Sequence, residues 1–182
     1  MPGYFYQPEE DSYLISECVK DYIKKLKDKN IKILDLGTGS GFQTKSLIDL
    51  GINKENITAS DINHYALKEA KKLKVKTIKS NLFDKIKDKY GLIVFNPPYL
   101  LENKYDKLPD TTGGKKGDEI ILKFLKQARN HLNPKGIILL LVSSLTPMKR
   151  INNILEKQKL KSKIIAEKKL FMESLYVLEI KE

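Results

Sequence analysis

The chain has 182 residues, the size of one domain, and its hydrophobic content of 41% excludes a disordered protein. A single cysteine, Cys18, excludes an internal disulfide framework and an all-cysteine zinc site, and we expect no metal. The net charge is +11, and every basic residue except Arg129, Arg150 and the two histidines is a lysine. This pattern favours a solvated lysine-rich surface over a dedicated nucleic-acid patch, in which arginine would be more frequent.

The sequence contains no feature of a membrane or exported protein. Its longest apolar run, 137–142, is far shorter than the ~20 residues that span a bilayer. The N-terminal segment contains Glu9, Glu10 and Asp11 where a signal peptide would have basic and apolar segments. We therefore expect a cytoplasmic protein without membrane contact.

Short apolar strands alternate with amphipathic helices along the chain. In chain order we expect a helix at 12–26, strand 31–36, helix 41–50, strand 57–61, helix 65–73, strand 75–78, strand 92–95, helix 118–132, strand 137–142, helix 151–160, and a closing strand pair at 163–167 and 175–180. This alternation predicts an α/β, Rossmann-like fold with a seven-stranded, mostly parallel sheet, helices on both faces and a C-terminal antiparallel hairpin. We expect one domain over 1–182, with an N-terminal helical cover at 1–30 and the core at 31–182.

Four polar residues end or directly follow separate strands: Asp35, Asp61, Asn81 and Asn96. Ligands of such folds bind at the carboxyl ends of the strands, so these side chains are expected to share one rim. The sequence therefore predicts a ligand site there.

The first part of this site is the segment DLGTGSG. Gly37, Gly39 and Gly41 allow a sharp turn and a close approach of the backbone to a ligand. The carboxylate of Asp35 would repel a pyrophosphate but suits a cationic ligand such as S-adenosylmethionine. A plain tight turn is the alternative.

The second part contains Asp61, whose carboxylate can accept hydrogen bonds from both hydroxyls of a ribose. Alternatively, Asp61 caps the next helix. Asn81 can bind the edge of an adenine and Leu82 can pack on its ring, although both can equally be loop residues without a ligand.

The most specific segment is Asn96-Pro97-Pro98-Tyr99. The Asn96 side-chain oxygen and the Pro97 carbonyl can accept both protons of a planar NH₂ group, and Tyr99 offers a face on which that group stacks. Two acceptors would orient the weak nitrogen nucleophile toward a methyl group, so catalysis would rest on orientation and polarisation. The alternative is a rigid Pro-Pro turn.

With these motifs in place, the sequence resembles the HemK-related class I S-adenosylmethionine-dependent methyltransferases. It is most similar to the short archaeal and eukaryotic branch that modifies release factors. The specific segments are NPPY and the N-terminal Tyr6-Gln7-Pro8-Glu9-Glu10-Asp11-Ser12, with weaker likeness at 113–117 and 170–180. The resemblance implies cofactor-binding roles for Ser12, Asp35, Gly37, Gly39, Gly41, Asp61, Asn81 and Leu82, and acceptor-binding roles for Asn96, Pro97, Pro98 and Tyr99. Asn81 stands where that branch usually has Asp.

The resemblance also implies the reaction, which is N5-methylation of the glutamine in the Gly-Gly-Gln loop of a translation release factor. An adenine N6-methyltransferase acting on RNA or DNA stays open, because NPPY suits that amine too. A protein lysine methyltransferase is a further alternative, although no general base is evident. A non-catalytic scaffold is disfavoured by the intact NPPY.

A partner subunit is expected at the third strand. The resemblance implies an edge position for segment 75–79 and a small zinc-ribbon activator that adds a strand there. Val75 and Ile78 are apolar residues that a bare edge would expose. The alternative is a lysine-guarded edge, with Lys74, Lys76 and Lys79 preventing pairing.

Overall fold

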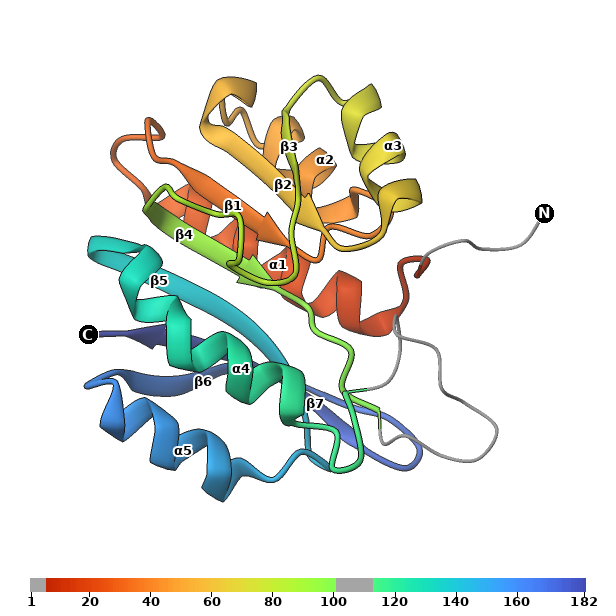
Figure 1. Cartoon of the computed structure of the whole chain (residues 1–182), viewed down its shortest axis with the longest axis vertical. Helices are drawn as coiled ribbons and strands as arrows, with labels where there is room; N and C mark the ends of the chain where they lie inside the picture. The colour runs from red at the N-terminus through yellow and green to blue at the C-terminus, as the bar shows by residue number, and fades with distance from the viewer. Residues whose placement is uncertain (1–5, 101–112) are drawn as a thin grey trace.

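The structure is a computed structural model, which describes residues 6–100 and 113–182. Its elements are α1 (Glu10–Lys25), β1 (Ile33–Leu36), α2 (Phe42–Asp49), a 3₁₀ turn (Lys54–Asn56), β2 (Ile57–Asp61), α3 (His64–Lys72), β3 (Lys76–Lys79), β4 (Tyr90–Phe95), α4 (Glu119–Ala128), a second 3₁₀ turn (Arg129–His131), β5 (Leu132–Ser143), α5 (Met148–Lys157), β6 (Lys161–Lys169) and β7 (Ser174–Lys181). The seven strands form one sheet in the order β3-β2-β1-β4-β5-β7-β6 (Figure 1). The expected Rossmann-like architecture is confirmed.

Strands β3, β2, β1, β4 and β5 are parallel, whereas β7 pairs antiparallel with both β5 and β6. In register, Asp35 of β1 lies between Ala59 of β2 and Val94 of β4. The strand order reverses at β1, since β2 lies on one side of it and β4 on the other. This reversal is the switch point at which the loops after β1 and β4 separate and leave room for a ligand.

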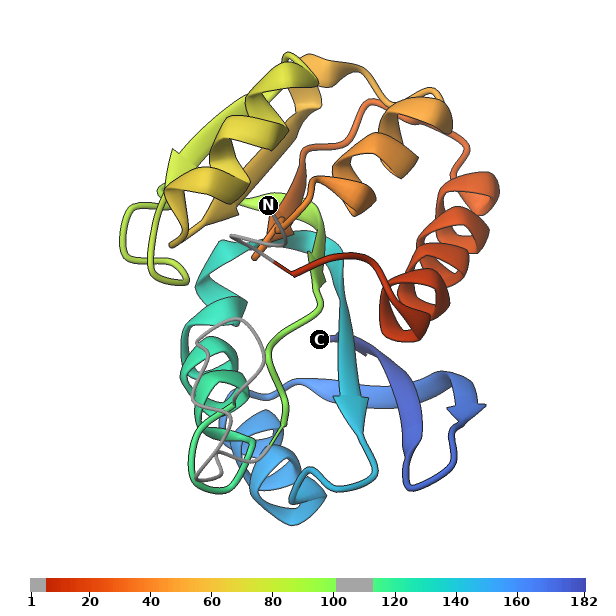
Figure 2. The same ribbon diagram turned by 90° about the vertical axis from the view of Figure 1, so that its right-hand side faces the viewer.

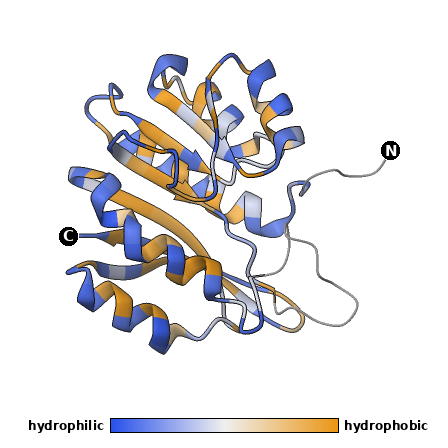
Figure 3. Ribbon diagram, in the orientation of Figure 1, coloured by the Kyte–Doolittle hydropathy of each residue, from blue (hydrophilic) through white to orange (hydrophobic). Residues whose placement is uncertain are grey.

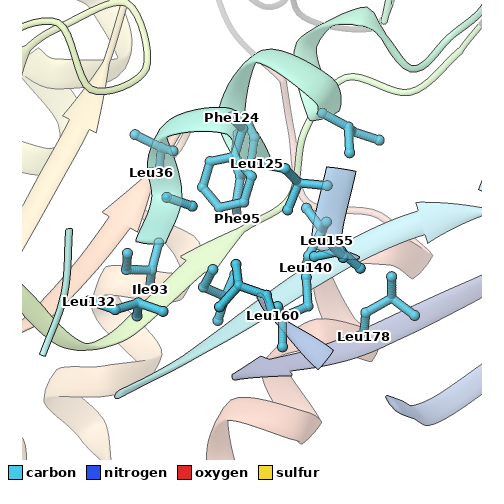
Figure 4. Packing of buried hydrophobic residues seen from close by; sticks show 14 of the residues in the cluster. Leu36, Ile93, Phe95, Phe124, Leu125, Leu132, Leu140, Leu155, Leu160 and Leu178 are labelled. Atoms are coloured by element: carbon cyan, nitrogen blue, oxygen red, sulfur yellow. The ribbon is translucent and has the colours of Figure 1, made fainter. Parts of the chain in front are cut away.

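The central strands are buried on both faces, which explains their continuous apolar sequence. Ile93 and Phe95 of β4 belong to one hydrophobic cluster with α4 and α5, whereas Leu92 and Val94 belong to the other with α1 and α2. Figure 3 shows the resulting apolar sheet between amphipathic helices, and Figure 4 shows Phe95 and Phe124 at the centre of the first cluster. The ring centroids of Phe95 and Phe124 are 4.8 Å apart.

The fifth strand is longer than expected and begins at Leu132 instead of Ile137. Its register with β4 shifts between the pairs Tyr90–Leu132 and Leu92–Ile137. Lys135 has a left-handed backbone with φ 63°, and a Cβ added at Gly136 would lie 2.8 Å from the carbonyl oxygen of Tyr90. The expected helix end at 132 is therefore wrong, because α4 ends at Ala128 and the 3₁₀ turn ends at His131. The segment 133–136 lies inside β5, where it interrupts the register with β4.

The other boundaries differ from the expected ones by a few residues. Helix α1 begins at Glu10, so Glu10 and Asp11 lie in its first turn, where acidic side chains are favoured. Strand β3 lies at the sheet edge, as expected, but Val75 and Ile78 are half-buried and pack against the two clusters. Within the described ranges, no helix has the length and apolar character needed to cross a membrane.

Candidate active site

A cavity of about 590 Å³ opens at the carboxyl ends of β1, β2 and β4. Its size suits a small-molecule ligand, for which cavities of ~300–1,000 Å³ are usual. Figure 2 looks onto this edge of the sheet, with the start of α1 and the chain leaving β4 both in view. The predicted residues that line the cavity are Ser12, Asp35, Gly37, Gly39, Asp61, Asn81, Leu82, Asn96, Pro97, Pro98 and Tyr99.

The buried side chain of Asp35 holds the glycine loop and the start of α2 by hydrogen bonds. Its Oδ2 accepts hydrogen bonds from the Thr38 hydroxyl at 2.6 Å, the Thr44 hydroxyl at 2.6 Å and the Thr44 amide at 3.0 Å. Burial raises the pKa of the Asp35 carboxyl, and these hydrogen bonds oppose the shift. Gly37 and Gly39 both have left-handed backbones, which the tight turn requires. One carboxylate thus fixes the loop and contributes negative charge to the cavity.

Asp61 connects the ends of β1 and β2. Its Oδ2 accepts the Gly39 amide at 2.9 Å, and its Oδ1 accepts the Asn63 amide at 2.8 Å. Burial raises the pKa of Asp61, because these backbone donors compensate only part of the lost solvation. Each carboxylate oxygen has a second lone pair, so the side chain can still accept two hydroxyl donors. The alternative role of Asp61 as the helix cap is wrong, because Asn63 caps α3 and its Oδ1 accepts the Tyr65 amide at 2.9 Å.

The turn after β3 presents Asn81 and Leu82 to the cavity. Leu82 has φ 47°, a conformation that is rare for a branched side chain. The Ser80 hydroxyl donates to the Leu82 carbonyl at 2.8 Å and accepts the Lys85 amide at 3.0 Å, which holds the turn in place. Backbone strain of this kind is often found at ligand sites.

The segment after β4 carries the clearest chemical signal. Oδ1 of Asn96 is buried and has no hydrogen-bond partner among the described residues. A buried acceptor without a donor costs about 1–3 kcal/mol, so this oxygen fits a ligand that supplies an N–H group. Burial raises the pKa of the Tyr99 phenol, with Asp11 the next contributor, so Tyr99 stays neutral. A Cβ added at Gly113 would lie 2.9 Å from the Pro98 carbonyl oxygen, so the 113–117 turn supports this segment closely.

The N-terminal segment covers the glycine loop. The Tyr6 hydroxyl donates to Oδ1 of Asp11 at 2.9 Å, and burial with the nearby Asp11 carboxylate raises the pKa of Tyr6. Nε2 of Gln43 donates to the Ser12 carbonyl at 2.8 Å, which joins α1 to α2. These contacts place the buried side chain of Ser12 beside the cavity.

The cavity is acidic although the chain is basic. Among its described lining residues, none is lysine, arginine or histidine, and the acidic ones are Glu9, Glu10, Asp11, Asp35, Asp61 and Glu173. This excess of carboxylates favours cationic or neutral ligands and disfavours phosphate groups.

Sequence reasoning and structure differ at a few positions. Gly41 does not line the cavity, because it faces α3, where an added Cβ would lie 3.2 Å from Leu73. Many of the residues that line the cavity were not predicted, and among them are the polar residues Tyr6, Gln43 and Glu173. Tyr6 lies in the N-terminal motif and could have been found there. Gln43 and Glu173 reach the cavity only through tertiary packing.

Comparison with known proteins identifies relatives over nearly the whole chain. The methyltransferase small domain family matches residues 16–172. A Methanocaldococcus jannaschii protein named as an N5-glutamine methyltransferase is 34% identical, over 95% of this chain and 89% of its own length. The release factor glutamine methyltransferase of Rhodopirellula baltica is 31% identical over 76% of this chain, which spans 53% of that longer protein.

A solved structure has the same fold and nearly the same length. It is the E. cuniculi Mtq2–Trm112 complex, which is responsible for methylation of the translation termination factor eRF1. The TM-score is 0.78 at 25% identity, with 98% of both chains covered. The chain therefore belongs to the methyltransferase small domain family, among the HemK-related class I methyltransferases.

Proposed function

We propose that the chain is an S-adenosylmethionine-dependent methyltransferase that modifies N5 of the glutamine in the Gly-Gly-Gln loop of a translation release factor. The observation that carries this proposal is the buried Oδ1 of Asn96, an acceptor without a donor at the cavity that Asp35 and Asp61 also line. The named activities of the M. jannaschii and R. baltica relatives support the same acceptor. Since release factors act in translation, the proposal also implies a cytoplasmic enzyme.

The residues that would hold the cofactor are Ser12, Asp35, Gly37, Gly39, Asp61, Asn81 and Leu82. When bound, the cofactor supplies an electrophilic methyl group on a sulfonium ion. The Asp35 and Asp61 carboxylates favour that positive charge, and the remaining lone pairs of Asp61 suit ribose hydroxyls. Asn81, exposed at the cavity, offers both an amide donor and an amide acceptor to an adenine edge.

The acceptor amide would be oriented by Asn96 and Pro97. Oδ1 of Asn96 and the Pro97 carbonyl each accept one N–H, so the amide nitrogen is polarised and held in a fixed plane. The neutral Tyr99 ring packs against this plane. Catalysis by these residues therefore consists of positioning and polarisation. As the N–C bond forms and the C–S bond of the sulfonium breaks, the nitrogen gives up one of its protons to solvent.

The acidic lining of the cavity favours some of the candidate methyl acceptors over others, because the acceptors differ in charge. A nucleic-acid strand brings a phosphate with each base, and the carboxylates around the cavity repel it. A lysine ammonium would be attracted, but the same carboxylates raise its pKa and keep it protonated, without a free lone pair. A glutamine amide is neutral and already carries its lone pair, so it fits both the charge and the chemistry.

A methyl-transfer assay tests the proposal. Tritiated S-adenosylmethionine is mixed with the purified chain and, in parallel, with a release factor, the same factor with its loop Gln changed to Ala, bulk RNA and a lysine-rich histone-like protein. We expect label only in the first release factor. Label in RNA or in the histone-like protein, with none in the release factor, would contradict the proposal.

A small activator subunit of the zinc-ribbon type is proposed at β3. Strand β3 is an edge strand, and its unpaired backbone groups can accept an added strand. The Mtq2–Trm112 structure supports a partner subunit, because that similar structure is an assembly of two proteins. The side chains of Val75 and Ile78 contribute less than expected, because they are already half-buried. Lys76 is paired with Asp88 at 2.8 Å, so it guards the edge less strongly than a free lysine would.

Co-expression of the chain with a zinc-ribbon protein of the same organism tests this partnership. We expect the two proteins to co-elute in gel filtration and the methylation rate to rise. A strand-breaking Thr77→Pro variant should lose co-elution. Lys27→Pro, in the exposed loop after α1, serves as the control for a general effect of proline on stability. If the wild-type chain elutes alone and its methylation rate does not rise, the proposed partnership is contradicted and the chain acts as a stable monomer.

A further inference from the structure

The turn between β6 and β7 carries the two most exposed large hydrophobic side chains of the described residues. Phe171 is 99% exposed and Met172 is 80% exposed. The turn is closed by a hydrogen bond from the Leu170 amide to the Glu173 carbonyl at 2.7 Å. An adjacent pair of large apolar side chains held in water is unfavourable unless a partner covers it.

This turn is attached to the rim of the cavity. The two residues that flank it, Leu170 and Glu173, line the cavity. The Ser143 hydroxyl donates to the Glu173 carboxylate, and an ion pair joins Lys168 to Glu10 at the start of α1. In Figure 2 the hairpin of β6 and β7 (blue) and the start of α1 (red) both lie in the right half of the view. Phe171 and Met172 therefore project from a fixed position beside the cavity.

Two further exposed apolar side chains lie near the turn or at the cavity. Leu145, 54% exposed, lies in the loop after β5, next to Ser144, which exchanges two hydrogen bonds with Ser174 at 2.7 and 2.9 Å. Leu100, 38% exposed, lines the cavity directly after the NPPY segment. The cavity lining therefore combines carboxylates with apolar residues such as Leu100 and Leu170, and the exposed pair Phe171 and Met172 follows directly after Leu170.

We infer that Phe171 and Met172 dock the folded acceptor protein, by contacting an apolar patch beside the loop that carries the acceptor glutamine. This inference rests on the proposed function, since it concerns the same acceptor. A glutamine that reaches Asn96 enters the cavity that Leu170 and Glu173 also line, so the polypeptide on either side of it passes close to the turn. A proposed activator at β3 would occupy the opposite edge of the sheet from β6 and would leave this turn free.

The test compares two acceptors with the double variant Phe171→Ser, Met172→Ser. One acceptor is the whole release factor and the other is a short peptide containing its Gly-Gly-Gln loop. We expect KM for the whole protein to rise about 10-fold or more, as for the loss of a buried anchor at an interface. The KM for the peptide, kcat and cofactor affinity should stay within about twofold, because the peptide lacks the folded patch.

A matched control is the double variant Ile164→Ser, Ile165→Ser on β6. Its residues are 53% and 38% exposed but lie in the strand, away from the turn, so its KM for the whole protein should not change. An unchanged KM in the Phe171, Met172 variant would overturn the inference. Equal increases for protein and peptide would also overturn it, because the turn would then shape the cavity instead of docking a folded protein.

Two further outcomes are distinguishable. A loss of self-association in gel filtration of the Phe171, Met172 variant would assign the turn to a contact between copies of this chain and overturn the inference. If the wild-type chain methylates neither the release factor nor its peptide, the proposed function itself fails and the docking inference falls with it.

Discussion

The Tyr6 hydroxyl and the Asp11 carboxylate form a hydrogen bond of 2.9 Å that holds the N-terminal segment over the glycine loop. The carbonyl oxygen of Tyr6 would lie 3.6 Å from a Cβ added at Gly39, so the two segments are in close proximity. Tyr6 also lines the cavity. The pair therefore connects the first described residues of the chain to the proposed cofactor site.

Removing this hydrogen bond should weaken cofactor binding. In Tyr6→Phe the ring remains but its donor is lost, and one net hydrogen bond is worth about 1 kcal/mol, or roughly a 5-fold rise in Kd. Isothermal titration calorimetry with S-adenosylmethionine measures this change. Tyr22→Phe, which removes a hydroxyl from α1 outside the cavity lining, is the control and should bind like the wild type. Equal affinities for all three proteins would exclude Tyr6 from this role.

Asp61→Ala should lose about 1.5–3 kcal/mol of cofactor binding, the scale of hydrogen bonds to a charged group. The variant loses the proposed ribose acceptor and also frees the Gly39 amide. Calorimetry again gives the affinity, with thermal unfolding recorded to show that the variant is folded. Asp49→Ala removes an exposed carboxylate at the end of α2 and should have no effect. A Kd for Asp61→Ala equal to that of Asp49→Ala would remove Asp61 from the site.

Asn96→Ala should lower kcat by roughly 10²-fold or more and leave cofactor affinity near the wild-type value. The physical reason is that Oδ1 of Asn96 has no partner in the free protein and would gain one only from the acceptor. Single-turnover assays on the release factor separate chemistry from binding. Asn153→Ala, on the exposed side of α5, is the control. Full turnover by Asn96→Ala would contradict the proposed mechanism.

The buried carboxyl of Asp35 should make stability depend on pH. Its pKa is raised above the ordinary 3.8, so the folded protein retains this proton to a higher pH than the unfolded chain. The free energy of unfolding should therefore fall as pH rises from about 4 through the raised pKa, and should stay lowered above it. Asp61, whose pKa shifts in the same direction, contributes with the same sign.

Urea unfolding of the ligand-free protein between about pH 4 and about pH 7 measures this dependence. In Asp35→Asn an amide oxygen still accepts the Thr38 and Thr44 donors, but no charge forms, so the slope should be smaller than in the wild type. Asp49→Asn should retain the wild-type slope. An unchanged slope in Asp35→Asn would show that Asp35 does not titrate in this interval.

The strands along the chain and the edge of the sheet that carries the site could be predicted because each rests on a local pattern. Apolar runs fixed the strands, and the residues that follow them, such as Asp35 and Asn96, necessarily share the carboxyl edge of a parallel sheet. The early start of β5 could not be predicted, since its excursion at Lys135 and Gly136 depends on the neighbouring strand. Local spacing also cannot distinguish a glycine that faces a ligand from one that faces a helix, as Gly41 does.

The cavity is lined by carboxylates, whereas the whole chain has a net positive charge, so the two attract ligands of different charge. Most lysines of the described residues are exposed, so a polyanion is attracted to the outside of the molecule, and salt weakens that attraction. The carboxylates that line the cavity would keep the same polyanion away from Asn96. The sign of the charge that a polyanion meets therefore depends on where it approaches, since the outer surface attracts it and the cavity repels it.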